Sequence, residues 1–136
     1  MRVVFADTFH WMATTNPRDQ WHGRAVQATR ALGECQIVTT EEVLIEYLNG
    51  FSRTRHARAQ AAATVRRAQS SASIEIVPQS NESFEAGLAL YEQRLDQGYS
   101  LTDCISMQAM RARGIQEILT ADEHFRQEGF ILLIRR

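Results

Sequence analysis

Five short apolar runs separated by longer helical stretches constrain the fold of this chain most strongly. The runs are three or four residues long and occupy residues 3–6, 37–39, 74–77, 118–120 and 131–134. Strands that are apolar on both faces are typical of a parallel sheet covered by helices on both sides. Helices are expected between them, at residues 19–32, 41–51, 57–70, 83–97 and 102–113, with short helices after the first and fourth strands. The alternation predicts an α/β three-layer fold around a central, mostly parallel five-stranded sheet.

The expected helix at 83–97 carries the clearest apolar stripe. Phe84, Leu88, Tyr91 and Leu95 are spaced so that they share one side of a helix. Such a stripe is typical of a helix that packs against a core.

The size of the chain suits a single domain over residues 1–136. With 44% apolar residues, it can form a core without disulfides or structural metals. Cys35 and Cys104 are far apart and form no C-x-x-C pair. We interpret both as small buried apolar residues rather than as zinc or redox ligands.

The chain contains no lysine, because all 15 of its basic residues are arginines. This excludes a P-loop nucleotide hydrolase and Schiff-base chemistry, which need a lysine. It also counts against a receiver-type phosphoacceptor domain. No apolar run approaches the ~20 residues that cross a bilayer, and Asp7 interrupts the N-terminal run. We therefore expect a cytoplasmic protein without a membrane partner.

Four acidic residues form the strongest chemical signal. Asp7 follows the first strand run and Asp122 the fourth, and ligands of parallel sheets bind beyond the carboxyl ends of strands. Asp103 begins an expected helix, and Glu46 lies in the apolar helix at 41–51. If the two strands are neighbours, we expect these carboxylates to converge.

Each acid also has a simpler interpretation. Asp103 follows Ser100 by three positions, which fits a helix capping box. Asp122 fits the first turn of a helix, where a negative charge is favourable. In the segment T-x-x-E, Thr39 and Glu42 also fit a capping box, so we assign Glu42 to the cap and Glu46 to the site. A carboxylate buried in that helix would need a partner, such as a metal ion.

A cluster of hard oxygen ligands selects Mg²⁺, or alternatively Mn²⁺, over zinc. Without a cation such a cluster would repel a phosphate. With a cation bound, it can stabilise the charge of a phosphodiester under attack and activate water. The residues alone therefore favour metal-dependent phosphodiester chemistry.

Four segments, VVFADT, TTEEVLIE, YSLTDCISMQAMRARG and ILTADEHF, together resemble the conserved blocks of PIN-domain ribonucleases. The length resembles the VapC-type toxins of toxin–antitoxin pairs. The resemblance implies a Mg²⁺-dependent endoribonuclease that hydrolyses RNA, forms a homodimer and is inhibited by a cognate antitoxin. It implies that the catalytic and metal-binding residues are Asp7, Glu46, Asp103 and Asp122, with auxiliary hydroxyls from Thr8 and Thr120. The alternative is a catalytically inactive PIN-like module that binds RNA or a protein partner.

Two positions depart from the family pattern. Phe9 stands where many members have a serine, and His124 stands where some have a further acid. His124 could contact phosphate or metal, or serve only as a structural hydrogen-bonding group. The number of metal ions therefore stays open.

Basic residues are concentrated in one segment of the chain. Residues 47–74 contain five arginines and no acid, although the whole chain has a net charge of −1. Arginine binds phosphate through its planar fork, so Arg53, Arg55 and Arg58 are candidate RNA-binding residues. A docking surface for an acidic antitoxin segment and a simple solvated helix face are the alternatives. Trp11, Trp21, Phe51 and Tyr99 could stack on bases, but core packing is the simpler interpretation.

Overall fold

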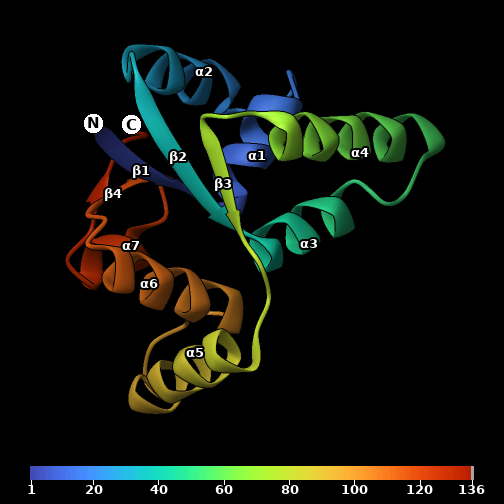
Figure 1. The fold of residues 1–136 in the computed structure, drawn as a ribbon. Helices are drawn as coiled ribbons and strands as arrows, with labels where there is room; N and C mark the ends of the chain where they lie inside the picture. The colour runs from blue at the N-terminus through green and yellow to red at the C-terminus, as the bar shows by residue number, and fades with distance from the viewer. Residues whose placement is uncertain (136) are drawn as a thin grey trace.

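The fold is a single five-stranded parallel sheet enclosed by seven helices, as seen in a computed structural model that describes residues 1–135 (Figure 1). All strand pairs are parallel, and the strand order is β3-β2-β1-β4-β5. The strands are β1 (Arg2–Ala6), β2 (Cys35–Thr40), β3 (Ile74–Val77), β4 (Glu117–Leu119) and β5 (Ile131–Leu132). The predicted α/β fold with its five-stranded sheet is confirmed, and each predicted apolar run contains a strand.

The helices also match the predicted segments, with small shifts at their ends. They are α1 (Thr8–Thr15), α2 (His22–Ala31), α3 (Glu41–Gly50), α4 (Arg55–Ser70), α5 (Asn81–Gln93), α6 (Leu101–Arg113) and α7 (Glu123–Gln127). Right-handed crossovers place α1 to α4 on one side of the sheet and α6 and α7 on the other, and α5 packs on α6. Figure 1 shows this division, with α1 and α4 on one side and α6 and α7 on the other. Helix α3 contacts both α1 and α6, so the layers meet near its position.

The strand order brings β1 and β4 together at the centre of the sheet. The chain proceeds outward from β1 towards β3 and, on the other side, from β4 to β5. This reversal is the switch point at which open parallel sheets bind ligands. Phe5 pairs with Ile118 and Ala6 with Leu119, so the next residues, Asp7 and Thr120, leave the sheet side by side.

The start of α3 differs from the predicted capping box. Thr40, not Thr39, is the N-cap, and its hydroxyl accepts a hydrogen bond from the Val43 amide at 3.1 Å. Thr39 is buried in the sheet, where its hydroxyl donates to the Ala6 carbonyl at 2.8 Å. The prediction that Thr39 and Glu42 form the box is therefore wrong, because the strand continues one residue further and uses the Thr39 hydroxyl.

Helix α5 does not bury its apolar stripe. Phe84 and Tyr91 are about half exposed and Leu95 is 83% exposed. The helix instead buries Gly87 and Leu90. A Cβ atom at Gly87 would overlap the Cγ1 atom of Ile105 on α6, so the absence of a side chain permits this close approach. The stripe read from periodicity is thus largely a surface feature.

Both cysteines are free, and Cys104 is buried as predicted while Cys35 is half-buried. Among the residues that the structure describes, no helix has the length and apolar character needed to cross a membrane.

Candidate active site

Asp7 occupies the end of β1 and is the most buried of the four predicted acids. Only 4% of the residue is exposed. The Thr120 hydroxyl, at the end of β4, donates a hydrogen bond to Asp7 Oδ2 at 3.0 Å. The contact follows from the register, which sets the two strand ends next to each other. The sheet thereby joins one predicted acid to one predicted hydroxyl.

Burial and neighbouring negative charge raise the pKa of the Asp7 carboxyl from 3.8 to about 7. Loss of solvent is the main cause, followed by the nearby charge of Asp103, with a smaller effect of Asp122. The hydrogen bond from Thr120 opposes the shift but does not cancel it. A carboxylate in this setting is costly to keep charged unless a cation lies close to it.

Asp103 and Asp122 come from helix starts on the same edge of the sheet. Asp103 forms the predicted capping box, because its amide donates to the Ser100 hydroxyl at 3.0 Å and its Oδ2 accepts from the Ser100 amide at 3.3 Å. Asp122 is the N-cap of α7, and its Oδ1 accepts from the His124 amide at 2.9 Å. The capping-box interpretation of Asp103 is therefore correct, whereas Asp122 is the N-cap that precedes the first turn of α7 rather than a first-turn residue. Capping orients each carboxylate without using all its oxygen lone pairs.

Asp103, Asp122 and His124 converge on one point. One ligand atom from each lies within 4.8 Å of the others, and all three residues are half-buried. The His124 Nδ1 atom is 3.4 Å from Asp122 Oδ1 and 3.9 Å from Asp103 Oδ2. Burial and the charges of Asp122 and Glu46 raise the pKa of Asp103. The three side chains could hold a metal ion, and their donor set of two carboxylates and one imidazole suits a divalent cation.

Glu46 adds negative charge to the region from helix α3, which packs against α6. Glu46 is exposed, so it does not need the charge partner that a carboxylate buried within α3 would require. The helix buries Val43, Leu44 and Tyr47 but leaves Ile45 exposed. Glu46 lies on the rim of a shallow pocket, which Thr102 at the start of α6 also lines. Asp7 and Glu46 are not part of the three-residue group that meets within bonding range of one ion.

The second predicted hydroxyl is placed differently from Thr120. Thr8 is buried next to Asp7 at the start of α1, and its hydroxyl has no hydrogen-bond partner. Phe9, the departure from the family pattern, packs edge-on against Trp21 with ring centres 5.4 Å apart.

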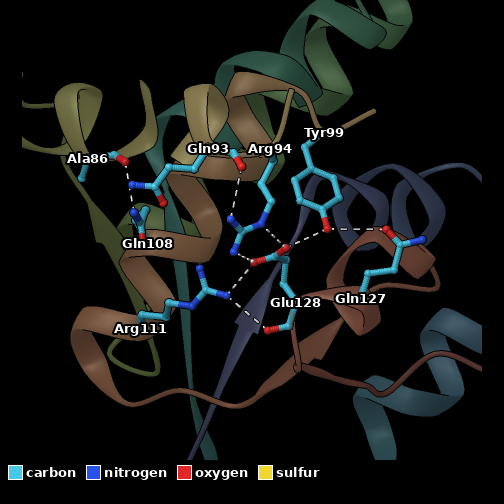
Figure 2. A network of polar contacts seen from close by, with 8 residues as sticks. All are labelled: Ala86, Gln93, Arg94, Tyr99, Gln108, Arg111, Gln127 and Glu128. Atoms are coloured by element: carbon cyan, nitrogen blue, oxygen red, sulfur yellow. Dashed lines mark hydrogen bonds and ion pairs between the residues drawn. The ribbon is translucent and has the colours of Figure 1, made fainter. Parts of the chain in front are cut away.

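A polar network fixes the segment that precedes α6 (Figure 2). Glu128 accepts hydrogen bonds from Arg94 at 2.9 Å, from Arg111 at 2.9 Å and from the Tyr99 hydroxyl at 2.9 Å. These donors lower the pKa of Glu128 to about 2, with the Arg94 guanidinium as the main cause. The buried Tyr99 ring in turn packs edge-on against His124 at 5.1 Å. The network therefore supports the His124 side of the site.

The candidate RNA-binding arginines lie away from these acids. Arg53, Arg55 and Arg58 are exposed where α3 leads into α4, and Figure 1 shows this connection at the end of α3 remote from the sheet. Within residues 1–135 none of them forms an ion pair. Of the aromatic candidates, Trp11 and Tyr99 are buried, which agrees with core packing.

The sequence leaves the role of His124 open, and it does not show that Tyr99 and Glu128 hold the His124 ring in place. The available signal for His124 was its position two residues after Asp122. The Glu128 network has no comparable signal, because its members are up to 34 positions apart in the chain.

Comparison with known proteins places the chain in a family. The PIN domain family matches residues 4–130. No curated protein sequence matches significantly. Among solved structures, the sarcin–ricin loop cleaving toxin VapC20 of Mycobacterium tuberculosis is 26% identical with a TM-score of 0.84, covering 94% of this chain and 96% of that chain.

Two more distant structures share the fold. DNA-bound VapBC of Salmonella typhimurium is 14% identical with a TM-score of 0.69, covering 97% of both chains. FitAcB of Neisseria gonorrhoeae is 13% identical with a TM-score of 0.66, covering 95% of both chains. The family match spans nearly the whole sheet and all four predicted acids, and the chain therefore belongs to the PIN domain family.

Proposed function

We propose that this chain is a divalent-metal-dependent endoribonuclease and the toxin of a type II toxin–antitoxin pair. The observation that carries the proposal is the convergence of carboxylates at the β1–β4 switch point, with Asp7 buried among other negative charges. Membership of the PIN family and the likeness to a sarcin–ricin loop cleaving toxin support the same activity.

The residues fit a divalent cation by their chemistry. Asp103 and Asp122 offer carboxylate oxygens at one point, and the buried Nδ1 atom of His124 has no hydrogen-bond partner there. Asp103, Asp122 and Asp7 would hold Mg²⁺ or Mn²⁺, and Glu46 at the rim would help to place the ion or orient water. The bound cation would offset the carboxylate charge, stabilise the phosphodiester under attack and lower the pKa of water.

The protein residues have separate tasks in this proposal. Thr120 holds the Asp7 carboxylate in one orientation through its hydrogen bond. The capping interactions of Asp103 and Asp122 fix these side chains at helix starts, so that they need little reorganisation when substrate binds. Arg53, Arg55 and Arg58 would bind the RNA backbone outside the reacting centre, without reading sequence.

We further propose that the partners are RNA, a second copy of the chain and a cognate antitoxin. The structural neighbours include VapBC assemblies, which supports an antitoxin partner. VapC20 is a sarcin–ricin loop cleaving toxin, so the sarcin–ricin loop is one substrate to include in a test.

The decisive experiment is cleavage of a defined RNA set by the purified chain. The set contains a sarcin–ricin loop hairpin, transfer RNA and a single-stranded RNA, each tested with Mg²⁺, Mn²⁺ or EDTA. We expect metal-dependent cleavage that is lost in an Asp7→Asn, Asp103→Asn double variant. An Asp96→Asn, Glu92→Gln double variant removes two exposed acids and should retain activity. RNA binding without cleavage by the folded, metal-loaded parent would instead favour the inactive module.

The basic segment is tested by the salt dependence of RNA binding. Replacing Arg53, Arg55 and Arg58 by Ala should weaken binding and reduce the slope of log K against log salt by about 2, at ~0.7 per phosphate contact for a single strand. The triple Arg→Lys variant keeps the charge and should keep the slope. An unchanged slope in the Ala variant would remove these arginines from the RNA-binding surface.

A further inference from the structure

We propose that His124 is a nitrogen ligand of the metal ion, and that the site therefore prefers Mn²⁺ over Mg²⁺. The inference rests on the proposed metal-dependent function and specifies the ligand set of that same site. It assigns to His124 a task that the chain's sequence left open.

The geometry of the ring nitrogen supports this assignment. His124 Nδ1 lies 3.4 Å from Asp122 Oδ1 and 3.9 Å from Asp103 Oδ2. Neighbouring ligands of an octahedral ion at ~2.1 Å are about 3 Å apart, and opposite ligands about 4.2 Å apart. The three donor atoms thus need only small movements to share one ion.

The state of Nδ1 provides an independent observation. The atom is shielded from solvent and has no hydrogen-bond partner, although Asp122 Oδ1 is nearby. That oxygen already accepts the His124 backbone N–H at 2.9 Å. A buried polar atom without a partner costs roughly 1–3 kcal/mol, and a cation at this position would remove that cost. A cation between the imidazole and the two carboxylates would satisfy the nitrogen and both oxygens together.

The ring is also held in place before any ion binds. Its neighbour Tyr99 packs edge-on at 5.1 Å, and the Tyr99 hydroxyl donates to Glu128 at 2.9 Å. Glu128 is fixed in turn by Arg94 and Arg111, as Figure 2 shows. Residues that orient a ligating imidazole raise the affinity of the metal site.

The ligand chemistry determines the metal preference. Mg²⁺ is bound almost entirely by oxygen ligands and keeps several waters. A first-row transition ion such as Mn²⁺ accepts an imidazole nitrogen beside carboxylates more readily than Mg²⁺ does. His124, in the place of the further acid that some family members carry, therefore shifts the site from Mg²⁺ towards Mn²⁺.

The test is pulsed electron paramagnetic resonance of the full chain with Mn²⁺ alone, together with calorimetric titration of Mn²⁺ and Mg²⁺. We expect ¹⁴N coupling to the bound Mn²⁺ in the parent and its loss in His124→Gln. Mn²⁺ affinity should fall about tenfold or more in this variant, while Mg²⁺ affinity changes much less. Glu123→Gln, which removes the neighbouring exposed carboxylate, is the matched control and should leave the coupling intact.

A second variant keeps the test decisive if His124→Gln is unstable. His124→Asp restores an oxygen ligand and should raise the ratio of Mg²⁺ to Mn²⁺ affinity. Mn²⁺ binding by the parent without ¹⁴N coupling would overturn the inference and leave the nuclease proposal standing. Failure of the parent to bind either ion would overturn both.

Discussion

Replacing Asp7 by Asn should stabilise the metal-free protein at neutral and alkaline pH. The Asp7 carboxyl is buried beside Asp103, and its pKa is raised from 3.8 to about 7. Asn has nearly the same shape and its carbonyl oxygen can still accept the hydrogen bond from Thr120, so the substitution mainly removes the charge.

The expected magnitude follows from proton linkage. Between pH 3.8 and 7 the folded state binds more protons at Asp7 than the unfolded state does, so stability falls as the pH rises through this window. A shift of about three units at ~1.4 kcal/mol each gives a penalty of about 4 kcal/mol above pH 7. Asp7→Asn should therefore raise the free energy of unfolding by up to about 4 kcal/mol at pH 8, and by almost nothing at pH 3.5.

The measurement is urea unfolding at both pH values in EDTA, with the exposed Asp96→Asn as control. Added Mg²⁺ or Mn²⁺ should stabilise the parent at pH 8, because ligand binding to the folded state adds to its stability. The same ions should stabilise Asp7→Asn much less. Equal stabilities of parent and variant at pH 8 in EDTA would refute the inference that the charged Asp7 carboxylate destabilises the metal-free protein.

Three further predictions concern residues outside the metal cluster. His10 is buried, and loss of solvent lowers its pKa from 6.5 to about 4. The neutral imidazole therefore contributes its full stability to the fold above pH 6.5, and this stability is lost as the pH falls towards 4. His10→Phe should remove about 3 kcal/mol of this acid sensitivity, measured as the parent–variant difference in urea unfolding between pH 7 and pH 4. Glu128→Ala should cost about 3 kcal/mol, because it removes the largely buried carboxylate that two arginines and a tyrosine hydroxyl share. Glu117→Ala breaks only an exposed ion pair and should cost less than about 1 kcal/mol in the same assay. Comparable losses in these two variants would contradict the buried network. Gly87→Ala should lower the melting temperature, because the overlap with Ile105, at about 2 kcal/mol, exceeds a helix-propensity gain of about 1 kcal/mol. An increase would show that α5 and α6 can separate freely.

The order of strands and helices was predictable because it depends on local patterns. Runs such as residues 3–6 and 118–120 contain no charged residue, and this pattern is typical of a strand covered on both sides of a sheet. The positions of Asp7 and Asp122 at strand ends follow directly from where those runs stop. The capping box of Ser100 and Asp103 was predictable for the same reason, since it involves four consecutive residues.

Other features depended on register and packing over long separations. Thr39 was mistaken for a cap because the sequence does not reveal that its hydroxyl is used by Ala6 on the neighbouring strand. The α5 stripe was expected in the core because periodicity identifies an apolar face but not the surface that covers it. Whether Glu46 is buried could not be predicted for a similar reason, since Val43 and Tyr47 of the same helix are buried whereas Glu46 is exposed.

The sequence by itself determined the α/β alternation, the chemical type of the site residues and their places at the ends of elements. Only the tertiary structure decided that β1 lies next to β4, which joins Asp7 to Thr120 across 113 positions. It also decided that His124 turns a buried, unpartnered nitrogen towards Asp103 and Asp122, braced by Tyr99. The physical reason is that propensity and periodicity act over a few residues, whereas a binding site forms where distant segments meet.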